Sequence, residues 1–168
     1  MSVAYLCLGS NLGDRVGYIQ QAAKLIEEGG FVSLIRSSAI YETEPWGNQE
    51  QGWFLNAIIE VKTKLSPNDL LKHCLDVEKR LGRNREGQAH WGARVIDVDI
   101  LLYGDSIINE IDLKIPHEHL HERAFALVPL LELIPDYEHP IYKKTLLTLH
   151  EELEEPEDVY LYGTIINE

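Results

Sequence analysis

Two aspartates in an apolar run have the clearest potential for chemistry. Asp97 and Asp99 alternate with aliphatic residues between Val95 and Leu102, so a strand places both carboxylates on one face. Their Cα atoms would lie roughly 6.6 Å apart, at a rise of about 3.3 Å per residue. Carboxylates this close repel each other unless a cation neutralises them, and two hard cations about 3.5–4 Å apart serve displacement at phosphorus. The pair therefore predicts a two-metal site; two solvated acids on an edge strand are the alternative.

Arginines gather just before this pair. Four of the seven arginines of the chain fall within fifteen residues: Arg80, Arg83, Arg85 and Arg94. Guanidinium groups bind phosphate oxygens in bidentate fashion, so beside two metal-binding acids they predict a nucleotide site, whereas alone they would be a solvated patch. The sequence contains no G-x-x-x-x-G-K-[ST] motif. Metal and arginine must therefore hold the phosphates.

A histidine cluster follows at 117–121. If this segment is extended, alternation aligns His117, His119 and His121, which would suit zinc. A histidine that contacts phosphates together with Arg123 is the better use of the same residues. We therefore expect a phosphate contact, with a zinc site as the alternative.

A third pair of residues could bind a planar heterocycle. Phe54 and Asn56 lie on one face of a predicted strand, where one can stack and the other can form hydrogen bonds. Core packing for Phe54 and a capped edge for Asn56 form the alternative. Ser10 has no G-x-S-x-G context, so nucleophilic catalysis has no anchor.

Local patterns predict the elements that must position these residues. Strands are predicted at 3–8, 31–43, 54–63 and 95–103, the last continuing through a hairpin turn at Gly104-Asp105 into 106–109. Helices are predicted at 14–28 and at 66–81, the second capped by Ser66. The order βαββαβ is that of the ferredoxin-like α+β fold, an antiparallel sheet with helices on one face. A C-terminal extension follows, with an apolar segment around 125–134.

Length and charge further limit the domain organisation and the partners that the chain can have. The 168 residues fit one catalytic domain, 1–168, in which about 151–168 form an acidic tail with seven acids and no base. The net charge of −13 argues against a nucleic-acid partner. No apolar run approaches the length of a membrane span and the N-terminus lacks a signal sequence, so we expect a cytoplasmic monomer. Cys7 and Cys74 form no metal or disulfide pattern and are expected to be buried thiols.

Six motifs together resemble the 6-hydroxymethyl-7,8-dihydropterin pyrophosphokinases of folate synthesis. They are LGSNLGDR at 8–15, YETEPWG at 41–47, FLNA at 54–57, GRNR at 82–85, HWGARVIDVDILLYG at 90–104 and PHEHLHERAFALVPLLELIP at 116–135. The resemblance runs in order from about Val3 to Leu149. It implies the ferredoxin-like fold and transfer of the ATP pyrophosphoryl group to the pterin hydroxymethyl oxygen, with release of AMP.

The resemblance also implies a role for each matching residue. Asp97 and Asp99 would bind two Mg²⁺ and act in catalysis with Arg83 and Arg94. The residues implied to bind ATP are Glu78, Arg85, His90, Trp91, Ile100, His117 and Arg123. The residues implied to bind the pterin are Thr43, Pro45, Trp46, Phe54, Asn56 and Phe125.

Three positions depart from the family pattern. His90 stands where arginine is frequent, in a longer loop that contains Glu86, so the contact of this position with ATP would depend on protonation of the imidazole. Phe54 replaces a frequent tyrosine but keeps its stacking face. Leu75 replaces a frequent glutamine and removes an adenosine contact.

Two other functions fit parts of the pattern. A metal-dependent phosphohydrolase could use Asp97, Asp99 and His117. An RNA-binding module would share the ferredoxin-like layout, but the sequence lacks the aromatic signature of such modules and is acidic.

Overall fold

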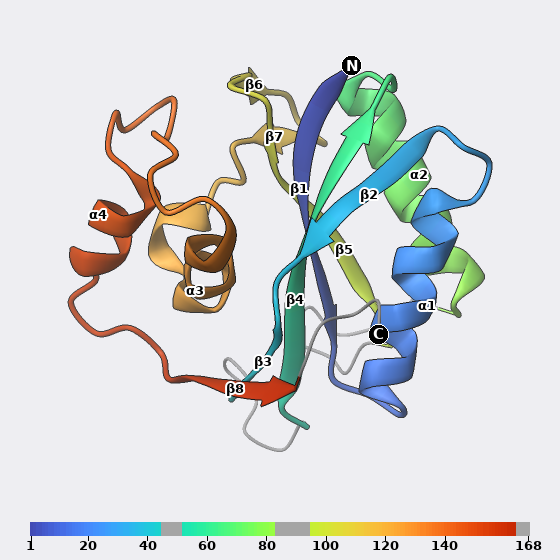
Figure 1. The fold of residues 1–168 in the computed structure, drawn as a ribbon, viewed down its shortest axis with the longest axis horizontal. Helices are drawn as coiled ribbons and strands as arrows, with labels where there is room; N and C mark the ends of the chain where they lie inside the picture. The colour runs from blue at the N-terminus through green and yellow to red at the C-terminus, as the bar shows by residue number, and fades with distance from the viewer. Residues whose placement is uncertain (45–51, 83–94, 164–168) are drawn as a thin grey trace.

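A six-stranded antiparallel sheet with helices on both faces forms the centre of the fold (Figure 1). The computed structural model describes residues 1–44, 52–82 and 95–163. Its strands are β1 (Ser2–Ser10), β2 (Val32–Ser37), β3 (Ile40–Thr43), β4 (Phe54–Thr63), β5 (Asp97–Tyr103), β6 (Ile108–Asn109), β7 (Lys114–Ile115) and β8 (Val159–Gly163). Its helices are α1 (Arg15–Glu27), α2 (Pro67–Arg80), the 3₁₀ helix η1 (Leu120–Glu122), α3 (Ala124–Leu133) and α4 (Leu146–Glu151).

The strand order identifies the topology. Along the sheet the strands run β5-β1-β4-β3-β8, and β2 pairs with the other half of β4. If β2 and β3 are counted as one bent strand, the core has four strands. Numbered by sequence, they lie side by side in the order fourth (β5), first (β1), third (β4) and second (β2 with β3), and every pair is antiparallel. This is the ferredoxin-like arrangement that the βαββαβ order predicts.

Helices cover both faces of the sheet, whereas the sequence predicts them on one. In Figure 1, α1 and α2 lie on one side of the sheet and α3 and α4 on the other. The first layer buries residues such as Leu6, Ile26 and Leu70, and the second buries residues such as Ile58 and Leu127. The reason lies in β1 and β4, which are buried along most of their length on both faces and therefore need two covers.

Both predicted helix starts are confirmed by their caps. The Ser66 side chain accepts a hydrogen bond from the Asp69 backbone N–H at 3.2 Å, and Pro67 stands at the first helical position. The Asp14 carboxylate accepts from the Gly17 N–H at 3.1 Å. Each cap satisfies a backbone donor that the helix leaves unpaired, so a short local pattern is enough to predict it.

The predicted strand at 31–43 is interrupted at Ser38. The hydroxyl of Ser38 accepts from the Ile58 N–H at 2.9 Å, in place of a backbone carbonyl. The next backbone donor, Ala39 N–H, turns away to the Glu132 carboxylate on α3 at 3.0 Å. The ladder therefore breaks into β2 and β3, both paired with β4.

The predicted hairpin at Gly104-Asp105 is wrong. Strand β6 pairs with β7, not with β5. The Gly104 N–H donates instead to the Val3 carbonyl at 2.7 Å. Glycine followed by aspartate marks a turn, but it does not decide which strand the chain joins afterwards.

The described part of the acidic C-terminal segment contains regular structure. Helix α4 is followed by β8, which pairs with β3 at the edge of the sheet. Cys7 and Cys74 are free and buried, as expected. In the described ranges each helix is too short or too polar to cross a lipid bilayer.

Candidate active site

The register of three neighbouring strands places the two predicted metal-binding acids and Asn56 on one side of the sheet. Asp97 on β5 is paired with Gly9 on β1, and Gly9 is paired with Asn56 on β4. One step further along, Asp99 is paired with Cys7. Paired residues of adjacent strands share a face, so both carboxylates and the amide of Asn56 lie on the face that α3 covers.

Gly9 leaves the space that this row needs. A Cβ atom at Gly9 would lie 2.7 Å from Asn56 Oδ1, which is closer than real Cβ contacts allow. A side chain here would displace the amide of Asn56. Gly9 lies inside β1, and its pairing with both Asn56 and Asp97 is the signal that reveals its role.

The pKa of the Cys7 thiol is shifted by the charged side chains near this row. Burial raises its pKa, the carboxylates of Asp99 and Asp97 raise it further, and the guanidinium of Arg123 opposes them. Its sulfur lies 3.9 Å from Asn56 Oδ1. The two carboxylates, the Asn56 amide and Arg123 therefore all lie near the Cys7 thiol. With its raised pKa this thiol stays protonated and unreactive.

The turn between η1 and α3 supplies the basic side of the site. Arg123 immediately precedes α3, and its Cζ lies 5.4 Å from the centre of the Phe125 ring. Burial, reinforced by the charge of Arg123, lowers the pKa of His117 to about 4, so its imidazole is neutral at pH 7. His117 Nδ1 accepts from the His119 N–H at 3.2 Å. Its Nε2 therefore carries the proton and can donate to an anionic oxygen.

Two strands form the wall where the planar ligand is predicted. Thr43 on β3 is paired with Phe54 on β4, and Asn56 follows on the same face as Phe54. Thr43 and Asn56 are both buried, whereas Phe54 is half-buried. Arg15 connects β3 with the start of β4, because its guanidinium donates to the Glu42 carboxylate and to the Trp53 carbonyl, each at 2.8 Å.

Two residues implied to bind ATP lie on the other face of the sheet. Ile100 packs in the core under α1 and α2. Glu78, on α2, is buried and accepts from the Val98 N–H at 2.8 Å. The structure therefore does not bring their side chains into the row of Asp97 and Asn56, and their roles stay predictions.

Seven of the predicted site residues lie outside the described ranges: Pro45, Trp46, Arg83, Arg85, His90, Trp91 and Arg94. Their implied contacts with ATP and the pterin stay predictions.

The zinc alternative lacks its geometry. The segment at 117–121 is not extended, because Leu120–Glu122 form the 3₁₀ helix η1, and the alternation that would align the imidazoles is lost. Within residues 1–44, 52–82 and 95–163 the structure contains no group of three or more His, Cys, Asp or Glu side chains that could hold a metal.

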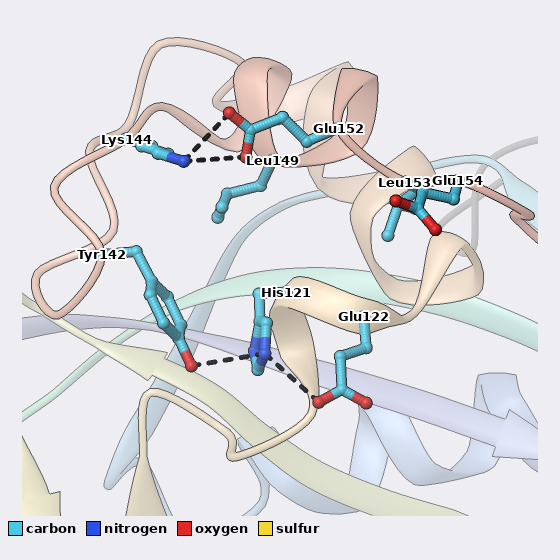
Figure 2. A pocket seen from close by; sticks show the side chains of 8 residues that line it. All are labelled: His121, Glu122, Tyr142, Lys144, Leu149, Glu152, Leu153 and Glu154. Carbon is cyan, nitrogen blue, oxygen red and sulfur yellow. Dashed lines mark hydrogen bonds and ion pairs between the residues drawn. The ribbon is translucent and has the colours of Figure 1, made fainter.

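A pocket of about 400 Å³ beside α4 is separate from this site (Figure 2). Its polar side chains pair with one another: Lys144 Nζ with the Glu152 carboxylate at 2.9 Å, and His121 Nε2 with Glu122 at 3.2 Å. The Tyr142 hydroxyl lies 3.3 Å from His121 Nε2. None of the predicted site residues lines it.

Comparisons with known proteins agree with the resemblance carried by the sequence motifs. A family model described as 7,8-dihydro-6-hydroxymethylpterin-pyrophosphokinase matches residues 5–135. A curated 2-amino-4-hydroxy-6-hydroxymethyldihydropteridine pyrophosphokinase from Aquifex aeolicus is 46% identical over 146 residues, covering 87% of this chain and 89% of its own length. A protein of the same name from Bacillus subtilis is 42% identical over 137 residues, covering 82% of this chain and 81% of its own length.

A solved structure supports the fold. The Plasmodium falciparum HPPK-DHPS wild type with SDX-DHP matches with a TM-score of 0.71 at 19% identity, over 90% of this chain. The chain corresponds to 43% of that longer protein. With the family model and the curated relatives, this places the chain in the 7,8-dihydro-6-hydroxymethylpterin-pyrophosphokinase family.

Proposed function

We propose that this chain transfers the pyrophosphoryl group of ATP to 6-hydroxymethyl-7,8-dihydropterin, with Asp97 and Asp99 holding two Mg²⁺. The hydroxymethyl oxygen attacks the β-phosphorus, the bond from that phosphorus to the α-phosphate oxygen breaks, and AMP leaves. The hydroxyl proton is lost to solvent. The products are the pterin diphosphate and AMP, the reaction that the names of the curated relatives describe.

The observation that carries the proposal is the row Asp97–Gly9–Asn56. It sets the Asp97 carboxylate, with Asp99 next on the same face of β5, on the same side of the sheet as the amide that would fix the pterin. The acceptor oxygen of the pterin would therefore lie next to the phosphate-binding acids. In-line geometry between two bound substrates can supply a large share of the rate enhancement, so no covalent nucleophile is needed.

The two acids suit Mg²⁺. Mg²⁺ prefers oxygen ligands, retains several waters and is often held by one or two carboxylates together with substrate phosphates. Asp97 and Asp99 are half-buried on the same face of β5, which leaves room for phosphates and water. When bound, the ions would neutralise the triphosphate and polarise its oxygens.

The remaining described residues have distinct tasks. Arg123 and the Nε2–H of His117 would bind phosphate oxygens from the η1–α3 side. Phe54 and Phe125 would stack on the pterin, while Asn56 and the backbone of Thr43 would form hydrogen bonds to its edge. Stacking of both rings on the pterin would exclude water from the acceptor oxygen, which would limit hydrolysis of ATP.

Product analysis tests the reaction. A turnover mixture of ATP, Mg²⁺ and the hydroxymethyl-dihydropterin is separated by nucleotide chromatography. We expect AMP as the product, formed only when both Mg²⁺ and the pterin are present. ADP as the main product would contradict pyrophosphoryl transfer, and AMP formed without the pterin would favour the phosphohydrolase alternative.

A cytoplasmic monomer without a nucleic-acid partner also stays our prediction. The net charge of −13 supports the last point, because it repels polyanions. Light scattering after size-exclusion chromatography would measure the oligomeric state, and a shift of labelled RNA on titration would contradict the absence of nucleic-acid binding.

A further inference from the structure

Helix α3 lacks the residue that normally caps a helix. Its N-cap position is occupied by Arg123, whose side chain forms no capping hydrogen bond. A guanidinium has no acceptor, so it cannot pair with the free N–H groups of the first turn. A residue placed here to bind phosphate therefore leaves the start of the helix uncapped.

A distant acid supplies the missing acceptor. The Phe125 backbone N–H donates to Glu157 Oε2 at 3.1 Å, across 32 residues of sequence. Glu157 is half-buried, although its neighbours on both sides are exposed. A carboxylate at a helix N-terminus also interacts favourably with the helix dipole.

The same segment reaches the opposite wall of the site two residues later. Val159 on β8 is paired with Thr43 on β3, and β8 follows β3 along the edge of the sheet (Figure 1). Aromatic contacts hold β8 in place: the Tyr160 and Trp53 rings lie 6.0 Å apart, and the Arg15 guanidinium lies 5.4 Å from the Tyr162 ring. The match to the family model ends at residue 135, before this segment begins.

We propose that residues 157–163 link the two walls of the pterin site, with Glu157 as a positioning residue that fixes the first turn of α3 and thereby the ring of Phe125. This inference rests on the proposed function, because it assigns Phe125 and Thr43 to the pterin. Glu157 acts through the hydrogen bond that its carboxylate accepts.

The consequence for binding follows from the position of Phe125. Its side chain projects from the first turn of α3, the part of a helix that frays when its cap is lost. A ring that must become ordered on binding lowers affinity. Loss of a cap therefore weakens pterin binding on the order of threefold to tenfold.

Three variants test the proposal. Glu157→Ala removes the acceptor, Glu157→Gln keeps an acceptor oxygen without the charge, and Glu155→Ala is a control on an exposed acid just before this segment. Calorimetry gives the Kd of the pterin with Mg²⁺ and α,β-methylene-ATP, whose α–β bridge cannot be cleaved. Hydrogen exchange of the Phe125 amide gives an independent readout without any ligand.

We expect Glu157→Ala to raise the pterin Kd and to speed exchange of the Phe125 amide, and Glu157→Gln and Glu155→Ala to resemble the unsubstituted chain. An unchanged pterin Kd in Glu157→Ala overturns the proposal, even if the variant unfolds at a lower temperature. A Glu157→Gln variant that binds as weakly as Glu157→Ala overturns the hydrogen-bond assignment. If the unsubstituted chain binds no pterin, the proposed function fails, and the exchange of Phe125 still decides whether Glu157 caps α3.

Discussion

Gly9 is required by space rather than by backbone conformation. It lies in β1 between Asp97 and Asn56, and a Cβ atom there would meet Asn56 Oδ1 at 2.7 Å. Glycine normally weakens a strand. At this position it leaves the space that the side-chain amide of Asn56 occupies.

Gly9→Ala should therefore weaken use of the pterin while the sheet still forms. Asn56 must turn away from the added methyl group, and one lost hydrogen bond to the substrate lowers kcat/KM for the pterin by about tenfold. Steady-state kinetics measures the effect. Ser33→Ala, at an exposed position of β2, is the control and should leave kcat/KM unchanged. An unchanged kcat/KM in Gly9→Ala would contradict the role of Asn56.

Asp97→Asn and Asp99→Asn should each abolish most turnover. Each change keeps the shape of the side chain but removes a charge from the metal-binding pair, so kcat should fall by at least about a hundredfold. The apo unfolding temperature should stay the same or rise, because the repulsion between the carboxylates is relieved. Asp105→Asn, on the exposed turn after β5, is the control. Residual turnover together with a large apo destabilisation would make these acids structural.

At the scale of elements, a network around Glu60 on β4 connects this strand with β1, β2 and α3 at the end of the sheet away from the site. The Tyr5 hydroxyl on β1 donates to Glu60 Oε2 at 2.5 Å, and Arg36 on β2 donates to the same oxygen at 3.1 Å. Arg36 also donates to the Leu133 carbonyl on α3 at 3.0 Å. Burial, reinforced by the Glu60 carboxylate, raises the pKa of Tyr5. The network therefore fixes α3 at the end opposite to Arg123.

Glu60→Ala should lower the free energy of unfolding by about 2–3 kcal/mol. The change leaves the buried Tyr5 hydroxyl and the half-exposed Arg36 without their acceptor, which costs more than loss of a surface ion pair. Urea denaturation followed by circular dichroism measures it. Glu110→Ala, at an exposed acid, is the control and should change stability by less than about 0.5 kcal/mol. A Glu60→Ala variant as stable as this control would show that the network contributes nothing.

At the scale of the whole molecule, two histidines make folding depend on pH. His139 is 1% exposed, and its Nδ1 accepts from the N–H groups of Ile141 and Tyr142 at 3.2 and 3.3 Å. Burial, reinforced by nearby His121, lowers the pKa of His139 to about 4, and the pKa of His117 is lowered to the same value. Between pH 6.5 and 4 the unfolded chain therefore binds more protons than the folded chain, so stability falls as pH decreases through that window.

His139→Asn should reduce this dependence. The asparagine Oδ1 can accept the two backbone N–H groups but does not titrate, so about one proton is removed from the slope of unfolding free energy against pH, or about 1.4 kcal/mol for each pH unit in the window. Urea denaturation at several values between pH 4 and 7 measures the slope. A variant with the same slope as the unsubstituted chain would show that His139 does not carry the effect.

The sequence by itself determined the features that depend on neighbouring residues. Ser66 with Pro67 and Asp69 predicts a helix start, and the alternation around Asp97 and Asp99 predicts which side chains share a face. Both predictions are confirmed, because helix caps and strand alternation arise within a few residues of backbone. The paired carboxylates and the arginines also predict a metal-bound phosphate as ligand, and this part stays a prediction.

Only the tertiary structure decided which distant residues meet. The row of Asp97, Gly9 and Asn56 depends on the register of three strands, and a slip by one residue would turn each side chain to the other face. The hairpin predicted at Gly104 was wrong for the same reason, because a turn signal does not choose a partner strand. The cap that Glu157 provides to Phe125 has no local signal, since the two residues are brought together by packing of α3 and by pairing of β8 with β3.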